Sequence, residues 1–162
     1  YTKDSETGKI TLLAIKNYHN KAINTKSATY YFKEAKLLKI ETTKKSQRAN
    51  DENNFGKKLN NTYYEYQLGY SLKNNSKKRV SSNGAELITP SGNQLSSNHG
   101  AIDELVGDKI QPGTKKTGLI QAIAGKEDIK KMNQYKFVSA ELIEDSGNYY
   151  GVDNQTTINF NK

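Results

Sequence analysis

The chain has 162 residues, enough for one domain with a substantial core and too few for two ordinary ones. Only 33% of the residues are apolar, so much of each element must face water, although eleven tyrosines add large rings to the core. The formal net charge is +8, and the absence of cysteine excludes disulfides, iron–sulfur clusters and thiolate zinc sites in this chain.

The N-terminal quarter of the chain contains two predicted strands. Residues 1–8 are polar, so we expect a disordered or linker terminus there and a single domain over residues 9–162. Residues 9–16 and 29–40 are apolar enough to be strands, and residues 17–27 between them are turn-like. Within 29–40 the apolar side chains change parity, which indicates a bulge. A helix is the rival interpretation of that segment, because it contains good helix formers.

Residues 43–61 form the most loop-like part of the sequence. They contain several lysines and asparagines and no apolar periodicity. A connection of this length is unusual in a compact domain, so its presence points to a functional or an irregular segment.

The clearest strand covers residues 62–73. Tyr64, Tyr66, Leu68, Tyr70 and Leu72 occupy every second position, with polar residues or glycine between them. Successive side chains of a strand point to opposite faces, so these five side chains share one face, which we expect to lie in the core. The segment 73–76 then ends the strand as a turn, because asparagine and serine favour turns.

The rest of the chain reads as short strands separated by turn signals. The predicted strands are 85–89, 117–123, 135–143 and 155–160. Residues 102–106 are a helical turn or a short strand, and residues 126–134 are a short helix or an irregular loop. Together these elements predict an all-β fold: an immunoglobulin-like antiparallel β-sandwich of about seven strands, with one or two short helical turns.

Three segments in order carry a family resemblance. They are Tyr66-Gln67-Leu68-Gly69-Tyr70-Ser71-Leu72-Lys73-Asn74-Asn75-Ser76, then Thr89-Pro90-Ser91-Gly92-Asn93-Gln94, then Ile110-Gln111-Pro112-Gly113-Thr114-Lys115-Lys116-Thr117-Gly118. Over roughly residues 29–125 this order and spacing resembles the telokin-like, immunoglobulin-like domain of Gram-positive secreted lipoproteins, a family of largely unknown function. The resemblance implies that Asn74, Pro112 and Gly113 form structural turns. It also implies an extracytoplasmic domain, joined to a membrane only through a lipid anchor outside this chain, and it transfers no catalytic residue.

No catalytic or metal-binding constellation is predicted. His99 lies near Ser96, Ser97 and Asp103 in sequence, but no nucleophile-elbow glycine pattern surrounds either serine, so a solvated loop histidine is the better interpretation. With only His19 and His99 available, a histidine-based metal site is not expected. Two acidic clusters lack the spacing of a calcium loop: Asp103, Glu104 and Asp108, and Glu141, Glu144, Asp145 and Asp153. The sequence predicts no cofactor.

The candidate contacts for a polyanion or a partner are basic residues of predicted loops and two tyrosines. They are Lys44, Lys45, Arg48, Lys57, Lys58, Lys77, Lys78, Arg79, Tyr149 and Tyr150. The 43–61 and 74–80 loops flank one strand, so we expect them at opposite ends of the sandwich, with the positive charge spread out. Nucleic-acid binding is not expected, because two arginines are few for contacts with bases and phosphates.

The leading hypothesis is a non-catalytic, extracytoplasmic interaction domain of a Gram-positive surface lipoprotein. It would bind a protein partner or a cell-wall polymer at the cell surface or after secretion. Two alternatives stay open: an enzyme or enzyme inhibitor with a site built from loops 43–61 and 93–109, or a weak polyanion binder. The sequence predicts no particular oligomeric state.

Overall fold

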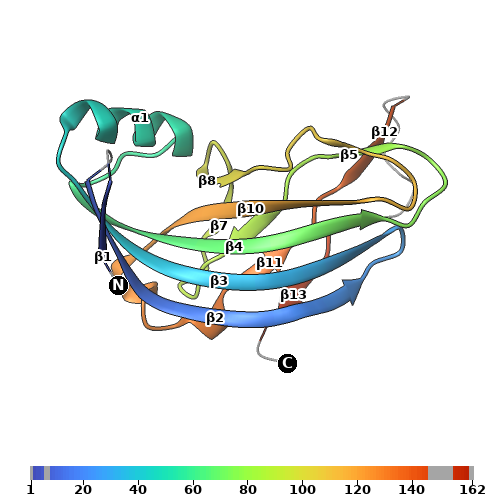
Figure 1. Cartoon of the computed structure of the whole chain (residues 1–162), viewed down its shortest axis with the longest axis horizontal. Coiled ribbons are helices and arrows are strands. Elements are labelled where there is room, and N and C mark those ends of the chain that lie inside the picture. The colour runs from blue at the N-terminus through green and yellow to red at the C-terminus, as the bar shows by residue number, and fades with distance from the viewer. Residues whose placement is uncertain (1, 6–7, 146–154, 161–162) are drawn as a thin grey trace.

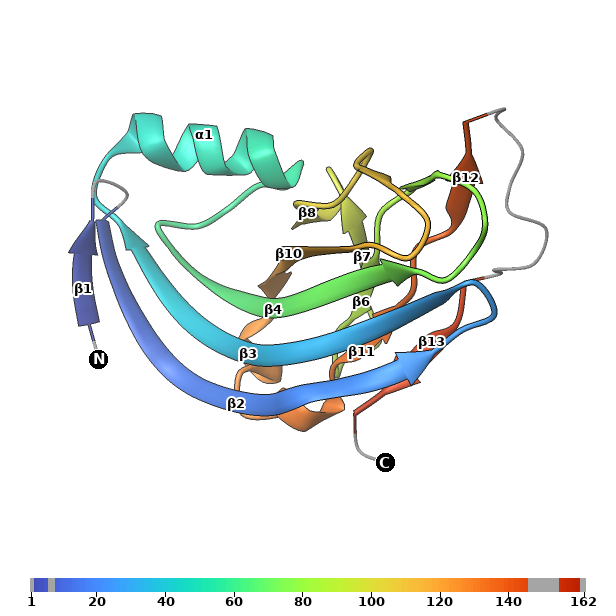
Figure 2. The same cartoon turned by 45° about the vertical axis from the view of Figure 1, so that its right-hand side comes forward.

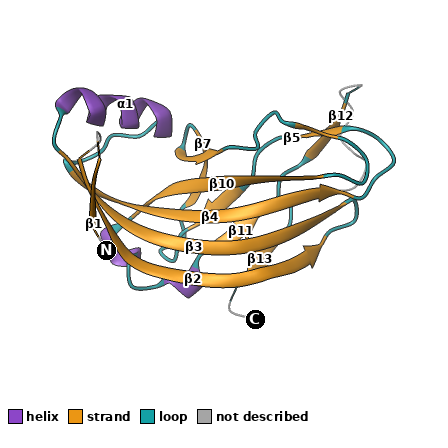
Figure 3. Ribbon diagram, viewed as in Figure 1, coloured by secondary structure: helices purple, strands orange, loops and turns teal. Residues whose placement is uncertain are grey.

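The fold is all-β, which confirms the predicted class. The computed structural model describes residues 2–5, 8–145 and 155–160. Within these residues it contains thirteen strands, one α-helix and two 3-10 helices (Figures 1 and 3). The sequence predicts about seven strands, and the difference arises mainly from short strands that its turn-rich segments conceal.

Four long antiparallel strands dominate the molecule. They are β2 (Gly8–Asn24), β3 (Ala28–Thr42), β4 (Thr62–Asn74) and β10 (Lys115–Ala124), adjacent in that order. Figures 1 and 2 show these strands running side by side along the long axis and curling strongly. The curl follows from strand twist and from the irregularities of β2 and β3 described below.

The same sheet continues through shorter strands into a second layer behind the first. Its ten strands have the order β1-β2-β3-β4-β10-β8-β7-β6-β11-β13, which bends into a half-barrel. A separate three-stranded sheet, β12-β5-β9, lies at one end. The shorter strands are β1 (Thr2–Ser5), β5 (Val80–Ser82), β6 (Glu86–Ile88), β7 (Gln94–Ser97), β8 (Gly100–Asp103), β9 (Lys109–Ile110), β11 (Lys136–Val138), β12 (Leu142–Glu144) and β13 (Thr157–Asn159).

The core lies between the long strands and the layer that contains β11 and β13. Tyr66, Leu68, Tyr70 and Leu72 of β4 are fully buried there, as their alternation predicts, and Tyr64 packs against them partly buried. Phe137 of β11 meets Tyr70 edge to face, with the ring centroids 5.1 Å apart. We call this side of the long strands the inner face and the opposite side the outer face.

A helix covers one end of the outer face, where the sequence predicts a loop. The expectation of a loop over 43–61 is wrong for α1 (Lys45–Phe55). Only Phe55 of this helix is buried, so the segment lacks the apolar stripe that would reveal a helix. Phe55 packs with Ile40, Tyr63 and Ile123 of the sheet in a small second core. The left-handed Gly56 ends the helix, with its N–H donating to the carbonyl of Asn53.

Three further expectations differ from the structure. The segment 17–27 is strand rather than turn as far as Asn24, because the polar residues of β2 pair with β3 through their backbone. The segment 135–143 is two strands, β11 and β12, which belong to different sheets. The polar residues 2–5, expected to be disordered, pair with β2 as β1, since ladder hydrogen bonds need no apolar side chain. The bulge expected in 29–40 is confirmed by the register shift between Phe32 and Ala35.

Two short 3-10 helices, η1 (Lys126–Asp128) and η2 (Met132–Gln134), follow β10. They agree with the helical or irregular segment expected over 126–134. No helix in the described part of the chain is both long and apolar enough to cross a membrane.

Candidate binding site

The basic residues singled out in the sequence lie in two groups at opposite ends of β4. Lys44, Lys45, Arg48, Lys57 and Lys58 surround α1, before the strand begins. The others, Lys77, Lys78 and Arg79, follow the end of the strand. The structure therefore does not gather them into one basic patch. Tyr149 and Tyr150 fall outside the described residues.

Four of these eight cations pair with carboxylates among the described residues. Near α1, Glu52 lies 3.7 Å from the Nε atom of Arg48 and 3.4 Å from the Nζ atom of Lys58. At the other end, Lys78 approaches Glu144 at 3.6 Å.

Arg79 is held by the most extensive of these pairs. Its Nη2 atom lies 2.6 Å from Asp145, and Lys109 reaches the same carboxylate at 3.2 Å. The hydrogen bond from Arg79, followed by that from Lys109, lowers the pKa of the Asp145 carboxyl. Arg79 thus already has a carboxylate partner.

The residues around His99 do not form a catalytic triad. His99 is exposed in a tight turn and donates its backbone N–H to the carbonyl of Ser96 at 2.9 Å. Asp103 is buried elsewhere, and its oxygens accept hydrogen bonds from the Tyr70 hydroxyl and from the N–H groups of Ala85 and Leu105. Asp103 therefore does not orient the imidazole. In the described part of the chain, no three His, Asp or Glu side chains are grouped to hold a metal ion.

The segments 43–61 and 93–109 do meet in space. A Cβ atom placed on Gly56 would lie 1.8 Å from the backbone oxygen of Asn98, so these two backbones pack directly together. The contact explains why glycine follows α1, but it brings no candidate catalytic side chains together.

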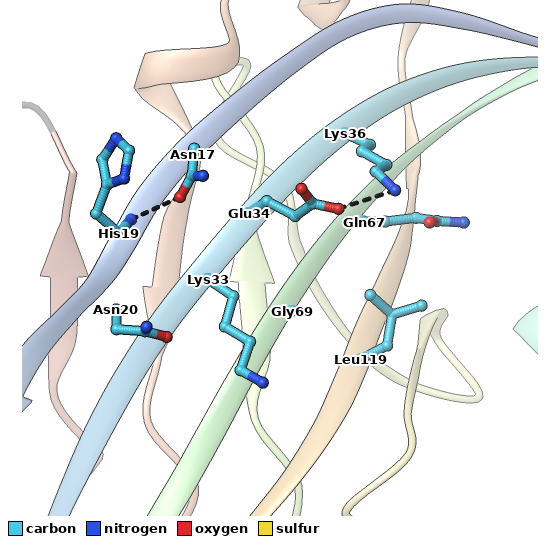
Figure 4. A pocket seen from close by; sticks show the side chains of 9 residues that line it. All are labelled: Asn17, His19, Asn20, Lys33, Glu34, Lys36, Gln67, Gly69 and Leu119. Atoms are coloured by element: carbon cyan, nitrogen blue, oxygen red, sulfur yellow. Dashed lines mark hydrogen bonds and ion pairs between the residues drawn. The ribbon is translucent and has the colours of Figure 1, made fainter.

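A large hollow lies on the outer face, beyond the part that α1 covers. It is a shallow trough of about 790 Å³ that crosses β2, β3, β4 and β10 (Figure 4). Its lining is mostly polar: Asn17, His19, Asn20, Lys33, Glu34, Lys36, Gln67, Gly69 and Leu119. We call this hollow the trough.

Backbone irregularities in adjacent strands shape the trough. In β2 the register shifts between Asn17 and Lys21, where His19 and Asn20 adopt left-handed conformations with φ of 52° and 58°. Asparagine and histidine tolerate this region better than most residues. The side-chain oxygen of Asn17 fixes the kink by accepting the N–H of His19 at 2.7 Å.

The next two strands deepen the trough at the same level. The β3 bulge falls at Lys33 and Glu34, directly beside Gly69 of β4. A Cβ on Gly69 would meet the Glu34 oxygen and the Lys33 Cβ at 3.7 Å, an ordinary contact distance. Gly69 also lies outside the left-handed region, so its backbone conformation does not require glycine. Its missing side chain leaves the floor of the trough open.

The trough presents cations and amides to solvent. Lys36 pairs with Glu34 at 2.9 Å, whereas Lys33 has no ion-pair partner among the described residues. The Nε2 atom of Gln67 donates to the Oε1 atom of Glu65 at 2.9 Å, so the amide nitrogen of Gln67 is held by the protein.

Glu65 lies between the trough and the small core under α1. Gln121 donates to the same carboxyl at 2.5 Å. Burial is the main influence on Glu65 and raises the pKa of its carboxyl, while the two glutamine hydrogen bonds act in the opposite direction. Glu65 thus orients the glutamine side chains that border the trough.

None of the trough residues is among the sequence-predicted contacts. Two signals for the trough exist in the sequence: the parity change in 29–40 and the glycine that interrupts the polar face of the 62–73 strand. Their alignment depends on the register of β3 against β4, which the sequence alone does not determine.

Comparison with known proteins establishes the fold only. No family model matches the sequence, and no curated protein matches it significantly. A functionally unknown protein from Listeria monocytogenes EGD-e is similar in structure, with a TM-score of 0.61, 16% identity, and coverage of 93% of this chain and 86% of that one. The yjhA protein from Bacillus subtilis has a TM-score of 0.50 and 11% identity, over 76% of this chain and 81% of that one. The chain therefore shares its half-barrel architecture with solved bacterial proteins.

Proposed function

We propose that this chain is a non-catalytic, extracytoplasmic domain of a Gram-positive surface lipoprotein that binds an anionic cell-wall polymer in the trough. The proposal includes the finer assignment of the fold to the immunoglobulin-like, telokin-like class. One observation carries it: the β2 kink, the β3 bulge and Gly69 coincide at one level of an otherwise regular sheet face. Such irregularities cost stability and concentrate at functional sites.

The chemistry of the lining suits a polymer of phosphates and hydroxyls. Lys33 supplies a cation without an ion-pair partner among the described residues, and Lys36 lies beside it across the bulge. The amides of Asn17 and Asn20 offer donors and acceptors for hydroxyl groups. The trough is open along the sheet, so a chain can lie across it without having an end enclosed. The formal net charge of +8 adds long-range attraction for a polyanion.

The experiment is a titration of the 162-residue chain with fluorescently labelled polyglycerol phosphate, with neutral glycan strands as the uncharged comparison. We expect Lys33→Gln to weaken binding by about fivefold, the effect of roughly 1 kcal/mol for one exposed charge contact. Gly69→Leu should abolish most binding by filling the trough. Lys45→Gln on α1 is the matched control, because it removes the same charge far from the trough.

Two results would contradict the proposal. The first is equal weakening by Lys33→Gln and Lys45→Gln, which would indicate attraction by net charge alone. The second is undiminished binding by a folded Gly69→Leu variant, which would place the ligand elsewhere.

A further inference from the structure

Three buried tyrosine hydroxyls lack a hydrogen-bond partner among the described residues. They belong to Tyr18, Tyr66 and Tyr135. Other buried tyrosines differ: the Tyr70 hydroxyl donates to Asp103 at 2.9 Å, and the Tyr63 hydroxyl to Asp51 at 3.1 Å. Buried polar groups in folded proteins almost always have a partner, either in the protein or in ordered water.

These three hydroxyls belong to one cluster on the inner face. The rings of Tyr66 and Tyr135 stack in parallel, with centroids 3.9 Å apart and planes 4° from parallel. Tyr18 comes from β2, Tyr66 from β4, and Tyr135 follows η2, so the cluster joins three separate segments. The Tyr18 and Tyr66 hydroxyls are close enough to affect each other's ionisation, although neither has a partner in hydrogen-bonding geometry.

A polar bridge lies beside the cluster. Lys16 on β2 reaches Asn133 of η2 at 2.7 Å, and its ammonium group lies 5.1 Å from the centre of the Tyr18 ring. This bridge joins the edge of the long sheet to the segment that carries Tyr135.

We infer that Tyr18, Tyr66 and Tyr135 form the wall of an internal hydration site that binds water between the two layers of the half-barrel. A buried water molecule makes about three hydrogen bonds, which three hydroxyls can supply. Burial raises the pKa of all three phenols, so they stay neutral and hold a neutral ligand. The nearby carboxylates of Asp128 and Glu127 act in the same direction as burial on Tyr135 and raise the pKa of its hydroxyl further.

The site has a consequence on the opposite face of β2. Tyr18 stands between Asn17 and His19, which line the trough. Water that anchors the Tyr18 hydroxyl therefore holds the β2 kink from the inside, while the Asn17 side chain holds it from the outside. The hydration site does not rest on the proposed ligand of the trough.

The sign of the stability change caused by one substitution tests the inference. Tyr66→Phe removes a hydroxyl and leaves the rings and their stacking in place. If water bridges the hydroxyls, the variant loses a satisfied hydrogen bond, and the unfolding equilibrium constant should rise roughly tenfold. If the hydroxyl is unsatisfied, its removal relieves a desolvation cost, and the variant should be at least as stable as the parent.

Water relaxation dispersion by magnetic resonance supplies a second readout. We expect at least one long-lived internal water in the parent chain and one fewer in Tyr66→Phe. Tyr70→Phe serves as the control, because it should lose stability without losing that water. Undiminished stability of Tyr66→Phe, or an unchanged count of long-lived waters, would overturn the inference.

Discussion

The hydroxyl of Tyr70 lies 2.9 Å from both carboxylate oxygens of Asp103, and this contact ties the middle of β4 to the end of β8. Asp103 also accepts the N–H groups of Ala85 at 2.7 Å and Leu105 at 3.1 Å. One buried carboxyl thus ties two connecting segments of the second layer, at Ala85 and Leu105, to the most strongly predicted strand. Burial still raises the pKa of Asp103, against the effect of these hydrogen bonds.

Tyr70→Phe should destabilise the fold by about 1–3 kcal/mol, because the substitution leaves a buried carboxyl short of one donor. The measurement is urea unfolding, with the midpoint expected to fall at an unchanged slope. Tyr31→Phe is the matched control: Tyr31 is half-buried on the outer face, and its described contact is with the Lys115 ammonium, over the ring. We expect that control to stay within about 0.5 kcal/mol of the parent, and a comparable loss in both variants would contradict the role of Asp103.

Gly56→Ala should lower the free energy of unfolding more than the same substitution at another left-handed glycine. Gly56 has φ of 64°, and its added Cβ would strike the Asn98 backbone, so we expect a loss of about 2–4 kcal/mol. Gly113 has φ of 73° with nothing within 4 Å of its Cβ position, so Gly113→Ala should cost only the backbone strain, about 1 kcal/mol. Thermal unfolding of both variants separates the clash from the strain. Equal losses would show that the backbones at Gly56 and Asn98 yield easily.

Glu65 should make stability fall as the pH rises. Its pKa is raised in the folded state, mainly by burial, so between the ordinary glutamate value and the raised value only the unfolded state has lost its proton. Folding therefore becomes less favourable as the pH rises across that window. Below and above the window, the contribution of Glu65 to the free energy of unfolding is constant. Unfolding free energies measured from about pH 4 to pH 8 should decline more in the parent than in Glu65→Gln. Parallel curves would show that Glu65 ionises normally in the folded protein.

The strand over 62–73 is predictable because its pattern has the period of its structure. Tyr66 and Tyr70 alternate with polar residues, and the buried face of β4 is the face that this alternation selects. The β3 bulge is predictable for the same reason, since a bulge changes the parity of the buried side chains.

Helix α1 shows where such reasoning fails. Its first residue follows Lys44, which makes no side-chain cap, and only Phe55 at its end is buried. The helix is held from outside by the fit of Phe55 against the sheet and of Gly56 against Asn98. The pair Phe55-Gly56 is the one local sign of it, because glycine commonly follows a helix C-terminus.

The trough is less predictable than either element. It requires that irregularities at His19, Glu34 and Gly69, far apart in sequence, reach one level of the sheet. The lysines chosen from loops lie at the two ends of β4, whereas Lys33 and Lys36 of the trough stand within a strand. Lysines within a strand look like ordinary solvated positions until the neighbouring backbone is known.

The half-barrel is left open between β2, the first of its long strands, and β13, the last strand of the sheet. Among the described strands no ladder joins β2 to β13, and the rings of Tyr18 and Phe160 meet there with centroids 4.7 Å apart. Aromatic faces can slide and rotate against one another, whereas a ladder of hydrogen bonds breaks in discrete steps. We therefore expect the seam to be more compliant than a ladder, so that motion along it appears first as flipping of these two rings, before any change in amide exchange.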